Sequence, residues 1–193
     1  MESIKKMLEQ AQNEFDPSKK RNLLNKVLSI EPENPEALKA LLYLGRLGEK
    51  GVKTGDYSAI RSYCLNIFDQ PENYRPEDVS SVIREMTDSD ALQACLKVVP
   101  EKEAFLRSYL SHISREYVRV FLEGDNLRNG SFMGLRLGNP RSRMTRYAVN
   151  MMLNVRKTQL PAPFDTLLPE ALMDAFDHCW DNLDLIKREL EKT

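Results

Sequence analysis

The chain has few of the residues on which most enzymes and metal sites depend. Its 193 residues include two histidines, three cysteines and one tryptophan. His112 and His178 belong to no HExxH or other zinc-binding spacing, and no CxxC pair occurs. His178 and Cys179 are a poor nucleophile–base pair, because neighbouring residues of a helix point about 100° apart. The sequence therefore predicts no catalytic residue, no cofactor and no metal ligand.

Long apolar runs and a secretory signal are also missing. No hydrophobic stretch approaches the roughly 20 residues that span a bilayer. The first residues, MESIKKMLEQ, are charged and helical in pattern, unlike a secretory leader. The three cysteines, Cys64, Cys95 and Cys179, lie far apart in segments with helical apolar spacing. We expect reduced core thiols, and hence a cytoplasmic protein with no membrane partner.

The small net charge of −1 predicts no general attraction to nucleic acid or to membranes. It hides a strong local asymmetry. Residues 124–160 hold seven basic side chains and one acidic side chain, whereas residues 161–193 hold eight acidic and three basic ones. A basic segment is therefore followed directly by an acidic one.

The sequence has no convincing strand alternation, and apolar residues recur with helical spacing throughout. Helix starts are marked by Asp16-Pro17, Asn34-Pro35, Asp56 and Ser89, each followed by an apolar stripe. A longer helix begins near Pro100 and is expected to stop at Gly124. We predict an all-α fold in which antiparallel helical hairpins occupy residues 1–123 and a basic, glycine-rich loop follows over 124–139. Two long helices over 140–193 are expected to pack on the first part as one unit.

One part of the chain carries a family resemblance. The stretch SKKRNLLNKVLSIEPENPEALKALLYLG, with PEN recurring 39 positions later, resembles the junction between tetratricopeptide repeats. With Pro32 at the terminal proline site, Ile4 and Met7 fall on apolar sites of the first helix of the repeat, Leu24 falls on its aromatic site, and Val27 follows three residues later. The resemblance covers about residues 1–100 and departs where Lys20 replaces a small residue. It implies stacked hairpins whose concave face binds a peptide or protein segment.

The basic segment NGSFMGLRLGNPRSRMTRY raises the prospect of an anion site. Asn139-Pro140 should start a helix, and arginines in its first turns oppose the helix dipole, so a nearby anion would relieve them. The three glycines at positions 130, 134 and 138 match neither a P-loop nor a dinucleotide fingerprint. A phosphate or an acidic ligand would each suit the segment. The candidate contacts are Arg128, Arg136, Arg141, Arg143 and Arg146.

The acidic C-terminal segment offers an internal counterpart. Leu172, Phe176, Cys179, Leu183, Ile186 and Leu190 alternate by four and three, and Asp174, Asp177, Asp181 and Asp184 lie on the opposite face. This stripe predicts a core-facing helix or a modest homodimer seam. The aspartates are either solvated or paired with the arginines, and we rank pairing within the chain slightly above an external anion.

The sequence favours a non-catalytic module that binds a protein or peptide in a helical groove, with the arginine segment contacting an acidic stretch. The first alternative is a nucleic-acid-binding protein that uses the same arginines together with Arg156 and Lys157. Few aromatic residues accompany them, which argues against a stacking platform for single strands. A small-molecule enzyme is the third reading, and it would need a closed pocket with convergent ionisable groups.

Overall fold

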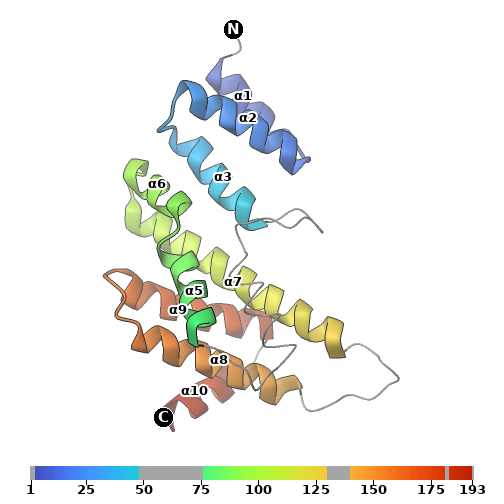
Figure 1. The fold of residues 1–193 in the computed structure, drawn as a ribbon, viewed down its shortest axis with the longest axis vertical. Helices are drawn as coiled ribbons and strands as arrows, with labels where there is room; N and C mark the ends of the chain where they lie inside the picture. Colours follow the sequence, from blue (N-terminus) through green and yellow to red (C-terminus); the bar gives the residue numbers. More distant parts are fainter. Residues whose placement is uncertain (1–2, 48–75, 130–139, 181–182, 193) are drawn as a thin grey trace. The chain divides into compact units, whose positions relative to one another are not determined.

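The computed structural model describes residues 3–47, 76–129, 140–180 and 183–192, and all regular structure within them is α-helical. This confirms the all-α prediction (Figure 1). The helix expected after Asp56, with Cys64, lies outside the described residues. The helices are α1 (Ile4–Asn13), α2 (Pro17–Ile30), α3 (Pro35–Leu47), α5 (Pro76–Thr87), α6 (Asp90–Val98), α7 (Lys102–Asn129), α8 (Pro140–Lys157), α9 (Phe164–Trp180) and α10 (Leu183–Glu191).

Polar caps begin α2, α3 and α6 where the sequence predicts them. The Asp16 carboxylate accepts a hydrogen bond of 2.9 Å from the Ser18 backbone N–H, at the start of α2. The Asn34 side-chain oxygen accepts one of 2.9 Å from the Ala37 N–H, at the start of α3. Ser89 caps α6 in the same way. Each cap satisfies a backbone donor that has no partner within its helix, which fixes the helix start.

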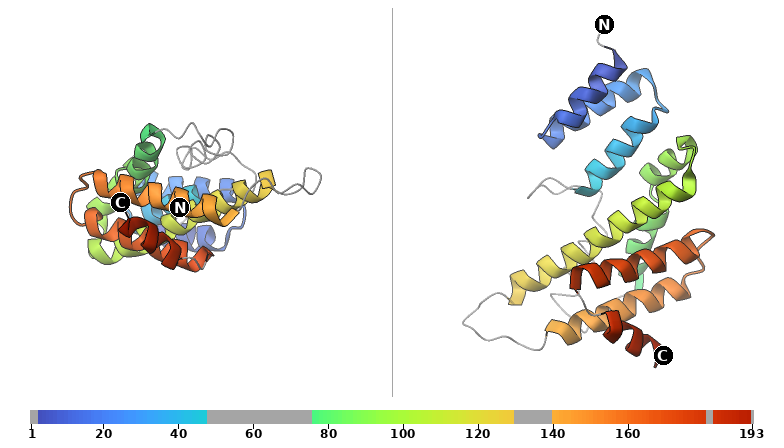
Figure 2. Two further views of the ribbon diagram at one scale, coloured as in Figure 1. Left: turned by 90° about the horizontal axis from the view of Figure 1, so that it is seen from below. Right: turned by 180° about the vertical axis from the view of Figure 1, so that it is seen from behind.

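The chain divides into two compact units. The first unit comprises Met1–Ser58 and Thr87–Lys102, and the second comprises Ala59–Met86 and Glu103–Thr193. The first unit therefore holds α1, α2, α3 and α6, whereas α5 and α7 to α10 belong to the second (Figures 1 and 2).

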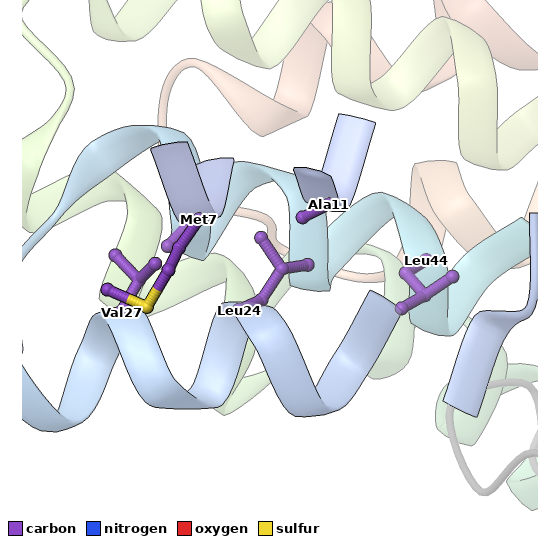
Figure 3. Close-up of a cluster of buried hydrophobic side chains, with 6 residues drawn as sticks. Met7, Ala11, Leu24, Val27 and Leu44 are labelled. Atoms are coloured by element: carbon purple, nitrogen blue, oxygen red, sulfur yellow. The ribbon is translucent and has the colours of Figure 1, made fainter. Parts of the chain in front are cut away.

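In the first unit α1 packs against α2, α2 packs against α3, and α3 packs against α6. The core cluster of α1 to α3 includes Met7, Ala11, Leu24, Val27 and Leu44 (Figure 3). Ile4 and Leu8 cover it as half-buried neighbours. The stripes read from the sequence are therefore the faces that the helices bury.

In the second unit α7 and α9 run past each other in the same direction. Arg107 contacts Glu170, Arg115 contacts Asp174, and the Tyr117 ring meets Phe176 edge-on at 6.3 Å between centroids. Contacts in rising order along both helices require this direction. Helix α8 follows α7 and precedes α9 in the chain, and it packs against α9 and α10.

Two predictions, one of a helix end and one of the number of C-terminal helices, are wrong. Helix α7 continues through Gly124 to Asn129, beyond the expected stop at the start of the 124–139 loop. A glycine inside a helix costs only about 1 kcal/mol relative to alanine, so it does not by itself end one. The C-terminal region also forms three helices, α8, α9 and α10, where two long ones were predicted.

Candidate functional site

The structure places most of the candidate arginines on helices. Arg128 belongs to the last turn of α7, and Arg141, Arg143 and Arg146 all lie within the first seven residues of α8. No acidic residue occupies the first turn of α8. Arg136 and the contacts of the other four side chains lie outside the part of the chain that the structure describes. Three of the five arginines thus share one helix start, and their phosphate or acidic ligand stays a prediction.

Two carboxylates of α9, Glu170 and Asp174, are paired with arginines that the sequence did not single out. Arg107 Nη1 lies 3.4 Å from Glu170 Oε2, and Arg115 Nη2 lies 3.1 Å from Asp174 Oδ2. Both arginines belong to α7. All four side chains are about half exposed, so each pair contributes only about 0–1 kcal/mol. Charge pairing within the chain therefore occurs at α9.

The C-terminal apolar stripe packs inside the chain where the structure describes it. Leu172 and Phe176 of α9 are buried, as are Ile186 and Leu190 of α10. These four residues therefore face the protein core, as one of the two predictions for the stripe expected. A homodimer through the C-terminal helix remains a prediction.

An open hollow lies on the α1–α2 hairpin of the first unit. Its volume is about 560 Å³. Helix α1 contributes charged and amide groups, α2 contributes the half-buried Leu23, and the cap of α1 contributes Glu14. Phe15 follows directly in the chain, and its side chain is 98 % exposed. The lining residues are Lys6, Glu9, Gln10, Asn13, Glu14 and Leu23.

The thiol of Cys95 is buried on α6. Burial raises its pKa from 9.0 to about 11, because the thiolate is poorly solvated there; the positive charge of Lys39 on α3 acts in the opposite direction. This agrees with the core thiol expected at this position. Cys64 and the Cys179 side chain lie outside the described residues.

We expect iodoacetamide to modify Cys95 about 100-fold more slowly in the native protein than in urea at pH 8, because a pKa raised from 9.0 to about 11 lowers the thiolate fraction that much. Because the folded protein holds the thiol proton more tightly than the unfolded chain does, this group contributes fully to the stability of the fold below pH 9. The contribution should be lost as the pH rises toward 11. Mass spectrometry of the Cys95 peptide measures the rate. Lys39→Met should slow labelling further, and native labelling as fast as in urea would contradict burial.

The described residues include no group of three or more histidine, cysteine, aspartate or glutamate side chains that could hold a metal ion. Within the same residues, no helix is long and apolar enough to cross a membrane.

Comparison with known proteins gave no match: no family model, no curated protein and no solved structure is significantly similar to this chain.

Proposed function

We propose that this protein is a non-catalytic binding module, and that the α1–α2 hairpin contacts a peptide or protein segment. The observation that carries the proposal is the 98 % exposure of Phe15, whose neighbour in the sequence, Glu14, lines the open hollow. Burying a phenylalanine side chain is worth about 1.5–3 kcal/mol. A single exposed aromatic residue is ordinary on its own. Here it directly follows Glu14, which lines the hollow, so one ligand can fill the hollow and cover the ring.

The lining of the hollow suits a polypeptide ligand. Lys6, Gln10 and Asn13 recur at intervals of four and three residues along α1, so they give the hollow a polar side. The side-chain amide nitrogen of Asn13 donates a hydrogen bond of 2.9 Å to the Glu9 backbone carbonyl, and its oxygen can accept one from a peptide N–H. Leu23 adds an apolar residue to the lining of the same hollow.

The packing of the first hairpin supports the tetratricopeptide-like arrangement. Met7 falls on an apolar site of that repeat, Leu24 on its aromatic site and Val27 three residues later, and all three are buried in one cluster. Consecutive packing of α1, α2 and α3 agrees with stacked hairpins. The arginines at the start of α8 would provide a second contact, with an acidic stretch of the partner.

The proposal can be tested by affinity capture from a nuclease-treated extract of the source cells. Wild type, Phe15→Ser and Ile30→Ser serve as baits. Ile30 is a matched control because it is the other large exposed apolar residue in the described part of the chain, at the far end of α2. We expect Phe15→Ser to weaken capture of the partner by about 30-fold or more, as is usual for an aromatic hot spot. Ile30→Ser should retain it.

Three results would contradict the proposal. Equal capture by Phe15→Ser and wild type would remove the hairpin as the site. A partner captured from an untreated extract but not from the nuclease-treated one would instead favour the nucleic-acid reading of the arginine segment. Unequal melting temperatures of the two variants would point to a stability effect, which the exposure of both side chains does not predict.

A further inference from the structure

We draw no further inference here: the strongest candidate, the groove of about 780 Å³ lined by α8, α9 and α10, has the buried core residues Met152 and Leu190 in its lining and charged side chains of both signs around it, and nothing in the structure shows what covers it.

Discussion

Replacing Phe176 with alanine should lower the free energy of unfolding of the second unit by about 3–5 kcal/mol. The side chain is 2 % exposed and lies edge-on to the buried Tyr117 ring. Its removal loses apolar burial, leaves a cavity and ends an aromatic contact that adds about 0.5–1.5 kcal/mol. The pair joins α7 to α9, so the loss falls on the packing of both helices.

Urea denaturation followed by circular dichroism measures this effect. Phe15→Ala is the matched control, since the same substitution removes a ring that is 98 % exposed. It should change the free energy of unfolding by less than about 0.5 kcal/mol. A Phe176→Ala cost as small as that of the control would contradict the packing of α7 on α9.

Leu24→Ala should destabilise the first unit by about 2–5 kcal/mol. Leu24 is 1 % exposed and belongs to the cluster that joins α1, α2 and α3. Because the chain has two compact units, the loss should appear first where Leu24 packs. Amide hydrogen exchange in α1 to α3 should accelerate, while amides of α8 and α9 should change much less.

Ile30→Ala is the control for Leu24→Ala, because it also truncates an aliphatic side chain of α2 to alanine. Ile30 is 56 % exposed, so little burial is lost and exchange should stay close to that of wild type. If Leu24→Ala accelerated amide hydrogen exchange equally in both units, the two units would not unfold independently, and the prediction would be wrong.

Local signals predicted the helices well where capping chemistry and an apolar stripe agree. Asp16 and Ser89 each combine a side-chain acceptor with a following buried stripe, and both caps form as predicted. The same reasoning overestimated the power of glycine to end a helix. Gly124 lies inside α7, because its cost is small compared with the gain from packing the rest of the helix.

Local sequence patterns could not predict the contacts between segments that lie far apart in the chain. The pairs Arg107–Glu170 and Arg115–Asp174 join residues about 60 positions apart, so they depend on how α9 docks along α7. An arginine on a helix surface gives no sequence signal of its partner. The buried hydroxyl of Ser114, within the apolar face of α7, was equally hard to foresee because serine is usually exposed.

The helix start at Pro140 was predicted, and it places Arg141, Arg143 and Arg146 in the first turns of α8. The anion contact expected of these arginines stays a prediction. The groove formed by α8, α9 and α10 was not predicted, because it needs three helices to meet.

The order of packing in the first unit has a consequence for folding speed. Helix α1 packs on α2 and α2 on α3, so these contacts close only short loops and can form early. The contact between α3 and α6 joins segments separated by about 40 residues, and closing such a loop costs roughly 3 kcal/mol in chain entropy. We expect the docking of α6 to limit the folding rate of this unit, so that substitutions within α6 slow it more than equal losses within the first hairpin.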